Sequence, residues 1–328
     1  MTDTALPPRP ALGVGGWSWP WLDRAGRFSF LKAGVLALLL APGLWLLARM
    51  AMADLGPRPL TEVIHQTGLW TFRFLLLSLA VTPARHIFRW GRLVLVRRMI
   101  GLGAAAYVAV HLLYYMANVM FDLPRILGEI AKANYLIIGL VALLGLAVLA
   151  ATSTDGMIRR LGGRRWQALH RLVYPIAGFG LLHFFMQSKL DVTEPTLLAG
   201  LLLWLLAYRL LKARLPRRPA LPLWLLAMLG LGSAVLTMLG EAVYFAQRTN
   251  LALVPRVLAA NFSIDMGVRP GIWVLLAGMG VTLAALAASI GARHSLQREI
   301  SRAFRFRRCQ SDPGRTGPAP APPGRSPS

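Results

Sequence analysis

Long apolar blocks separated by short polar connections dominate the chain. We place eight such blocks near residues 30–50, 66–84, 98–120, 135–153, 168–187, 196–212, 221–245 and 270–291. Their lengths approach or reach the ~20 residues that a helix needs to cross a bilayer, and they do not form the short stripes of surface helices. The pattern predicts an all-α fold, a polytopic transmembrane helix bundle of about eight spans.

The composition agrees with a membrane protein. Of the 328 residues, 56% are hydrophobic and 15% are charged, whereas a soluble domain has about 25% charged residues. The mean hydropathy is +0.54. The lipid bilayer is therefore the expected surroundings of most of the chain.

The net charge of +23 could suggest a nucleic-acid-binding protein, but the distribution of the charge argues against that class. Of the 36 Lys and Arg residues, 27 lie in alternate connections and in the two terminal segments. Basic residues favour the cytoplasmic side of a membrane. We therefore expect both termini to be cytoplasmic and expect no nucleic-acid partner.

The regions that flank the spans differ in composition. Residues 1–29 contain Pro, Gly and Trp without periodicity, which indicates a flexible cytoplasmic arm before a first transmembrane helix and loop at 30–59. Residues 213–292 contain two additional transmembrane helices. Residues 293–328 are basic and end in a Pro-rich stretch, so we expect a disordered cytoplasmic tail.

Histidine is the main candidate for chemistry within the spans. The single cysteine, Cys309, excludes an intramolecular disulfide, a Cys-ligated zinc site and a protein-bound iron–sulfur cluster. His111 lies thirteen residues into the third span and His183 fifteen residues into the fifth, at heights of about 20 and 22 Å. Two imidazoles at one depth could ligate one iron from opposite faces of a porphyrin. The alternative is that these histidines form interhelical hydrogen bonds.

His170 lies about 20 Å below His183 in the same expected helix. The two positions differ by roughly 220° around that helix, although Pro175 between them could introduce a kink. The residue of the third span that is level with His170, and within about 40° of the face of His111, is Arg97. Arginine does not ligate iron, but it pairs well with a propionate or a phosphate.

Arg73 lies about seven residues into the second span, where a charge is costly unless it is paired or reaches the interface. It could hold a propionate of an outer haem. Equally, its long side chain could extend to the nearby membrane surface.

Three segments resemble a known family. They are "TGLWTFRFLLLSLAVTPAR" (67–85), "RRMIGLGAAAYVAVHLLYYM" (97–116) and "LAVLAATSTDGMIRRLGGRRWQALHRLVYPIAGFGLLHFFMQSK" (146–189). They are similar to the MsrQ family, the haem-binding membrane subunits of bacterial periplasmic methionine sulfoxide reductase systems, within the wider group of ferric-reductase-like transmembrane domains. The resemblance covers residues 60–212, which are the expected haem-binding transmembrane domain.

The resemblance implies a b-type haem protein in the bacterial inner (cytoplasmic) membrane. Electrons would come from a cytoplasmic flavin reductase or from membrane quinone. They would go to a periplasmic molybdopterin subunit that reduces methionine sulfoxide in oxidised proteins, so the chain would be an electron-transfer subunit rather than a catalyst on its own. FMN is also associated with the family.

Carried over by position, the resemblance assigns roles to the histidines. His111 and His183 would be the axial ligands of one haem b, the outer haem. His170, the third metal-ligand candidate, would belong to an inner haem or flavin site together with Arg97.

Other functions stay open from the sequence. The two additional spans leave room for a different electron acceptor. No Gly-rich dinucleotide fingerprint follows a strand, so the electrons must arrive from another molecule. A histidine-using transporter is less favoured, because only Glu241 among the acids approaches a span interior. A cofactor-free scaffold would leave His111 and His183 without a matched purpose.

Overall fold

The computed structural model describes residues 19–23, 25–188, 191–215, 220–248, 250–263 and 267–310, without the side chains of residues 253 and 292–310. These residues form helices and one isolated β-bridge, with no strand. The helices are α1 (Phe30–Ala51), α2 (Pro59–Ile87), η1 (Gly91–Leu93), α3 (Val94–Asn118), α4 (Leu123–Lys132), α5 (Asn134–Ala151), α6 (Asp155–His170), α7 (Val173–Gln187), α8 (Thr193–Arg214), α9 (Leu223–Arg248), η2 (Leu251–Leu253), α10 (Val254–Ala260) and α11 (Pro270–Gln310).

Seven helical segments among the described residues are long and apolar enough to cross a membrane. They are α1, α2, η1 with α3, α5, α8, α9 and the Pro270–Gly291 part of α11. The eighth expected span corresponds to α7, a shorter apolar helix of 15 residues. The predicted all-α, polytopic membrane bundle is therefore confirmed.

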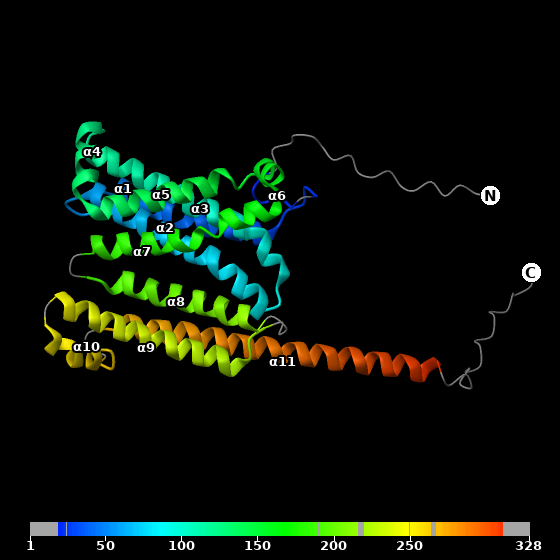
Figure 1. Cartoon of the computed structure of the whole chain (residues 1–328). Coiled ribbons are helices and arrows are strands. Elements are labelled where there is room, and N and C mark those ends of the chain that lie inside the picture. The colour runs from blue at the N-terminus through cyan, green and yellow to red at the C-terminus, as the bar shows by residue number, and fades with distance from the viewer. Residues whose placement is uncertain are drawn as a thin grey trace, which may run out of the picture.

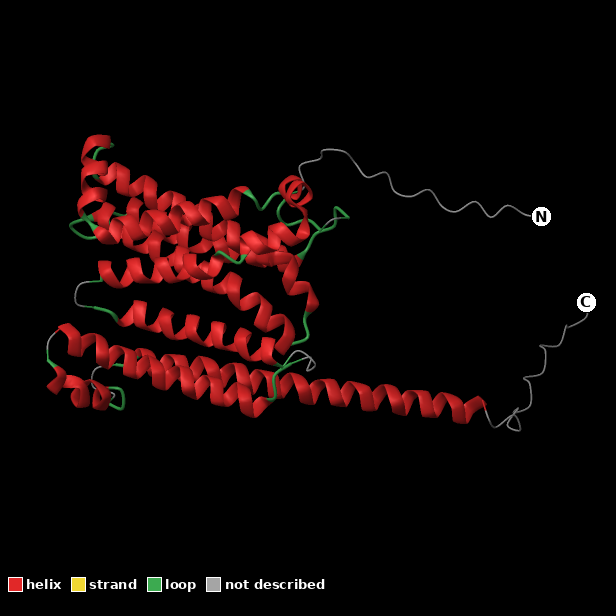
Figure 2. Ribbon diagram, viewed as in Figure 1, coloured by secondary structure: helices red, strands yellow, loops and turns green. Residues whose placement is uncertain are grey.

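The spans run side by side with their connections gathered at two ends (Figures 1 and 2). The α4 end carries the short helices α4 and α10. The α6 end carries α6 and the first residues of α1, and α11 extends beyond the bundle there. Helix α2 packs on α3 and α5 packs on α7, while α8 and α11 both pack on α9.

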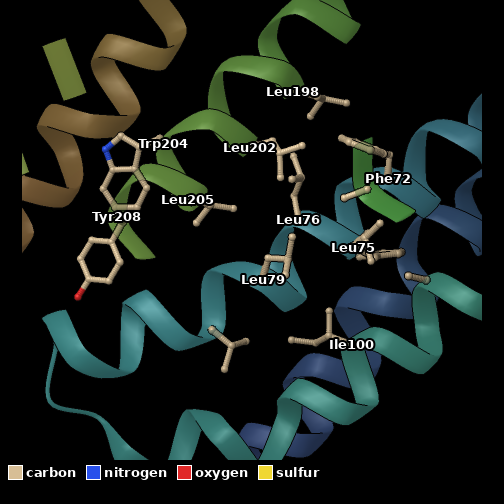
Figure 3. Close-up of a cluster of buried hydrophobic side chains, with 14 of the residues drawn as sticks. Phe72, Leu75, Leu76, Leu79, Ile100, Leu198, Leu202, Trp204, Leu205 and Tyr208 are labelled. Atoms are coloured by element: carbon tan, nitrogen blue, oxygen red, sulfur yellow. The ribbon is translucent and has the colours of Figure 1, made fainter. Parts of the chain in front are cut away.

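Helix α2 forms the centre of the core because apolar side chains on several of its faces are buried. Phe74 and Leu79 are almost completely buried within it. Figure 3 shows its neighbours Phe72, Leu75 and Leu76 next to Leu198, Leu202 and Leu205 of α8. On the same helix α8, the rings of Trp204 and Tyr208 stack with centroids 5.7 Å apart.

Glycine allows α9 and α11 to approach each other at the backbone. A Cβ atom added at Gly278 would lie 2.6 Å from the Cα of Gly230. Small residues of this kind are typical of contacts between membrane helices, which gain van der Waals energy by close approach. Helix α8 also approaches α9 closely at Gly200, where an added Cβ would clash with Thr237 Oγ1 of α9.

The structure corrects the expected fifth span. The chain does not form one helix through both histidines, since α6 ends at His170 and α7 begins at Val173. Pro175 has no N–H to donate to the carbonyl of Arg171, so the regular hydrogen-bond ladder is interrupted there. His170 and His183 therefore lie on different helices.

The prediction of disorder throughout residues 293–328 is wrong for residues 293–310. Their backbone continues α11 to Gln310. After Gly291 the sequence has neither Gly nor Pro until Pro313, and residues 293–310 include six Arg and two Gln, which favour helices. The rest of the expected tail, 311–328, lies outside the described residues.

The expected N-terminal arm, 1–29, is folded in its last part. Residues 1–18 and 24 lie outside the described residues, but Leu22 and Phe28 form a β-bridge. The carboxylate of Asp23 accepts hydrogen bonds from the backbone N–H groups of Ala25 and Arg27, which lower its pKa. The ammonium of Lys32 donates to the carbonyl of Leu22 at 2.7 Å and ties this turn to α1.

Candidate functional site

His111 of α3 and His183 of α7 face each other inside the bundle. Their ring centroids are 6.5 Å apart and the ring planes are nearly perpendicular, at 89°. The structure thus brings together the two histidines that the sequence placed at one depth. The chain segments that separate them include all of α4, α5 and α6.

Each imidazole is oriented by a backbone carbonyl of a neighbouring helix. His111 Nδ1 lies 2.8 Å from the carbonyl oxygen of Ile64 in α2, and His183 Nδ1 lies 2.8 Å from that of Tyr135 in α5. A carbonyl oxygen only accepts hydrogen bonds, so each Nδ1 is the donor and each neutral ring keeps its lone pair on Nε2. Metal-bound histidines in proteins show this second hydrogen bond.

A glycine lies against each ring. A Cβ atom added at Gly68 of α2 would lie 3.1 Å from Nδ1 of His111. A Cβ atom added at Gly139 of α5 would lie 2.7 Å from Nδ1 of His183, closer than real Cβ contacts. Because glycine has no side chain, both rings can lie directly against a helix backbone.

The spacing of the two rings fits one metal ion between them. With a His–metal bond of about 2 Å and a ring centre about 1 Å behind the bonding nitrogen, imidazoles on opposite sides of one metal have centres roughly 6 Å apart. No group of three or more His, Cys, Asp or Glu side chains that could hold a metal occurs among the described residues. Two facing imidazoles without further metal-binding side chains would suit haem iron better than a tetrahedral zinc ion, which needs four ligands.

A polar network covers the α4 end of this pair. The hydroxyl of Tyr115, one turn after His111, donates to Glu129 of α4 at 2.9 Å, and Arg125 pairs with the same carboxylate at 2.9 Å. The hydrogen bonds from Arg125 and Tyr115 lower the pKa of Glu129. The network fixes α4 across the end of α3.

Arg73 forms a contact that the sequence did not predict. Its guanidinium pairs with Glu194 of α8 at 3.0 Å and lies over the ring of Trp70 at 4.8 Å. Arg73 follows Gly68 by five residues, which places the two roughly 140° apart around α2. Arg73 therefore faces α8, whereas Gly68 faces His111, and its role toward a propionate stays a prediction.

His170 lies at the α6 end in a contact between α5 and α6. Its Nε2 is 3.2 Å from the hydroxyl of Thr152, and its ring stacks on Trp166 with centroids 4.0 Å apart. The indole N–H of Trp166 donates to the carbonyl of Thr152 at 2.9 Å. This arrangement holds the last turn of α6 against the end of α5.

Arg97 and Arg209 bring positive charge to the same end of the bundle. Burial, followed by the charge of Arg97, lowers the pKa of His170. Arg209 of α8 donates to the carbonyls of Leu79 and Leu205 and lies 5.6 Å from the ring centre of Tyr174. Neither Arg97 nor Arg209 forms a salt bridge with a carboxylate among the described residues.

From the sequence, Arg209 and the other basic residues near the end of α8 contributed only to the predicted orientation of the chain in the membrane. Thr152 was present in the quoted "TS" pair, but its contact with His170 spans 18 residues. The two carbonyls and two glycines around the outer histidines carry no local signal for such a role. These residues become visible only when the helices are packed.

Comparisons with known proteins find similarity in the central part of the chain. A family model described as "Ferric reductase like transmembrane component" matches residues 67–181, from α2 into α7. No solved structure is similar enough to count as a match.

Curated relatives share one name, "Protein-methionine-sulfoxide reductase heme-binding subunit MsrQ". The protein from Rhodospirillum rubrum is 46% identical over 197 residues, which are 60% of this chain and 92% of the relative. That from Xanthomonas campestris pv. campestris is 41% identical over 57% of this chain and 88% of its own. That from Caulobacter vibrioides is 38% identical over 53% and 83%. Because this chain spans nearly all of these relatives at such identity, it belongs to the MsrQ family.

Proposed function

We propose that the chain is a b-type haem electron carrier of the bacterial inner membrane. It passes electrons from a cytoplasmic flavin reductase or membrane quinol to a periplasmic molybdopterin subunit that reduces methionine sulfoxide in oxidised proteins. The observation that carries the proposal is the His111–His183 pair, 6.5 Å apart with both Nε2 atoms free of the carbonyl hydrogen bonds. The name of the relatives supports haem as the group that it holds.

The residues of the chain would act by binding and orientation. A bound haem would supply an iron that accepts and releases one electron at a time. His111 and His183 would hold it through Nε2, while the carbonyls of Ile64 and Tyr135 keep the hydrogen on Nδ1 and fix the ring planes. The surrounding apolar spans would limit the access of water to the haem and thereby help to set its redox potential.

The α6 end is the place for a second cofactor, an inner haem or FMN. Arg97 and Arg209 form no salt bridge with a carboxylate among the described residues, which suits a propionate or a phosphate, although Arg209 already donates to two backbone carbonyls. His170 could ligate an inner iron through Nε2 only by giving up its contact with Thr152. The arginines therefore support this site more strongly than the histidine does.

A spectroscopic experiment tests whether His111 and His183 are the haem ligands. The purified chain is expected to show a reduced-minus-oxidised b-type haem spectrum. His111→Ala and His183→Ala each remove a ligand, so each is expected to lose most of that haem when haem is quantified per protein. His65→Ala is the matched control, because His65 lies on α2 near His111 but is exposed.

Two results would contradict the assignment. One is full haem content in the His111→Ala, His183→Ala double variant, and the other is a well-folded wild-type preparation without a Soret band. The acceptor needs a separate measurement, in which the reduced chain is mixed with the purified periplasmic reductase subunit and methionine sulfoxide. Reoxidation of the haem that requires both additions supports the proposed acceptor.

A further inference from the structure

A cavity of about 560 Å³ lies between α7, α8 and α9. All residues that line it follow residue 181, so they lie outside the segment that the family model matches. Its volume is within the ~300–1,000 Å³ of small-molecule sites. The cavity is therefore large enough to hold a ligand, and it is separate from the His111–His183 pair.

The walls of the cavity are mainly apolar. Three wall residues carry a hydroxyl group: that of Thr237 donates to the carbonyl of Ser233 at 2.7 Å, whereas those of Thr196 and Tyr244 have no hydrogen-bond partner among the described residues. A Cβ atom added at Gly240 would meet nothing within 4 Å, so the space beside this residue is open. The apolar lining comes from all three helices: Leu182, Phe185, Met186, Ala199, Leu203, Leu236 and Val243.

The cavity follows α9 toward the α4 end. The lining residues of α9 run from Leu236 to Arg248, about 18 Å along a helix. This length is close to half of the ~30 Å hydrocarbon core of a bilayer. The shape therefore suits an apolar chain that enters from one leaflet.

Two polar residues, Gln247 and Arg248, mark the end of the cavity at the last turn of α9. Both are exposed, and the guanidinium of Arg248 lies over the ring of Tyr244 at 5.3 Å. Among the described residues, Arg248 forms no salt bridge with a carboxylate. A cation at the edge of the membrane, next to an apolar cavity, fits the phosphate of a lipid. A neutral headgroup such as a quinone would leave this charge without a counter-ion.

We propose that the cavity binds one phospholipid, with an acyl chain between α7 and α9 and its phosphate on Arg248. The lipid would fill the space between α7, which carries His183, and α9, the first of the two additional spans. It would thus be a structural ligand of this chain rather than a redox carrier. The proposal does not rest on the presence of haem.

Two variants test the binding of the acyl chain and the contact with the phosphate separately. Gly240→Leu fills the open space beside Gly240, and Arg248→Gln removes the cation. Their matched controls are Gly232→Leu, at a second open position of α9, and Arg256→Gln, an exposed cation of α10 at the same end. The full chain is reconstituted in phosphatidylglycerol–phosphatidylcholine nanodiscs, extracted in mild detergent and analysed by native mass spectrometry.

The wild type and both controls are expected to retain a single phospholipid per chain. Arg248→Gln is expected to reduce that bound fraction about tenfold, as for the loss of one charged hydrogen bond. Gly240→Leu is expected to reduce it similarly while melting at the same temperature as Gly232→Leu. The haem spectrum is expected to be the same in all variants, so this test and the test of haem ligation can fail independently.

Three outcomes would overturn the proposal. The first is equal phospholipid retention in all five proteins. The second is an isoprenoid quinone as the retained molecule when the chain is extracted from native membranes. The third is displacement of the lipid by inorganic phosphate alone, which would show that the apolar cavity contributes nothing.

Discussion

At the scale of single residues, the arrangement of His111 and His183 depends on glycines and on backbone carbonyl groups. Gly68 and Gly139 leave room for the imidazoles, and the carbonyls of Ile64 and Tyr135 set their orientation. A larger residue would push a ring away from its carbonyl and rotate the Nε2 lone pair. In the proposed haem site, positions without reactive atoms would thereby determine the orientation of both ligands.

Gly139→Ala is expected to weaken haem binding about 10- to 100-fold, the usual cost of disturbing a residue behind a metal ligand. The added Cβ would lie 2.7 Å from His183 Nδ1, so the ring must move. Haem content and the Soret maximum of the purified protein measure the effect. Gly178→Ala on α7 meets nothing within 4 Å and is the control. Identical haem content in both variants would show that Gly139 does not position His183.

The sequence predicted part of this site. Chain direction and helix rise were sufficient to place His111 and His183 at one depth, because both quantities are local. The pairing of Arg73 with Glu194 joins residues 121 positions apart, so no local pattern contains it. The stacking of His170 on Trp166 is a contact between residues four apart in α6, and it was missed because the expected span began at residue 168 and left Trp166 out.

At the scale of helices, a few specific contacts join spans that otherwise share only apolar surfaces. The Arg73–Glu194 ion pair joins α2 to α8. The Gly230–Gly278 contact joins α9 to α11. Apolar side chains gain little by leaving lipid for a helix interface, so such contacts select which neighbours pack together.

Arg73→Gln and Glu194→Gln are expected to destabilise the chain by similar amounts, and the double variant is expected to cost no more than either single change. Both side chains are partly exposed, so the coupling is expected to be about 0.5–1 kcal/mol. Thermal unfolding in detergent measures it. Haem content is expected to be unchanged in Glu194→Gln, and it is unchanged in Arg73→Gln as well if Arg73 only pairs with Glu194. A loss of haem confined to Arg73→Gln would instead support a contact with a propionate.

Gly278→Ala is expected to destabilise the packing of α9 on α11 by about 1–3 kcal/mol, the usual cost of overpacking. The added methyl group would meet backbone atoms of Gly230, which cannot rotate away. Gly280→Ala on the same helix meets nothing within 4 Å and is expected to be neutral. Unfolding followed by tryptophan fluorescence compares the two, and equal midpoints would contradict the close approach.

At the scale of the whole molecule, the position of the spans followed from hydropathy, whereas their ends did not. Apolar length placed five of the seven long spans to within three residues at each end; α2 begins earlier, at Pro59, and so does the span of η1 and α3, at Gly91. The extension of α11 was missed because a charged sequence was taken for a disordered one, although its residues favour helix. Charge indicates where the bilayer ends, but it does not indicate where a helix ends.

The predicted orientation can be tested with Cys309, the single cysteine of the chain. If both termini are cytoplasmic, a membrane-impermeant thiol reagent is expected to label Cys309 in inside-out vesicles but not in intact spheroplasts. In a Cys309→Ser background, Arg256→Cys on α10 is expected to show the opposite pattern. Labelling of both positions from the same side would contradict the crossing of α11, and the reverse of the expected pattern would contradict the predicted orientation.

The unbroken length of α11 has a mechanical consequence. The helix has 41 residues, about 60 Å, and it continues past Gly291 without a joint. Immediately before its first residue, Arg269 is paired with the buried Glu241 of α9 at 2.7 Å, which fixes the rotation of α11 about its own axis. A partner that binds α11 near Gln310 could therefore rotate the helix about its axis only by straining the Arg269–Glu241 ion pair.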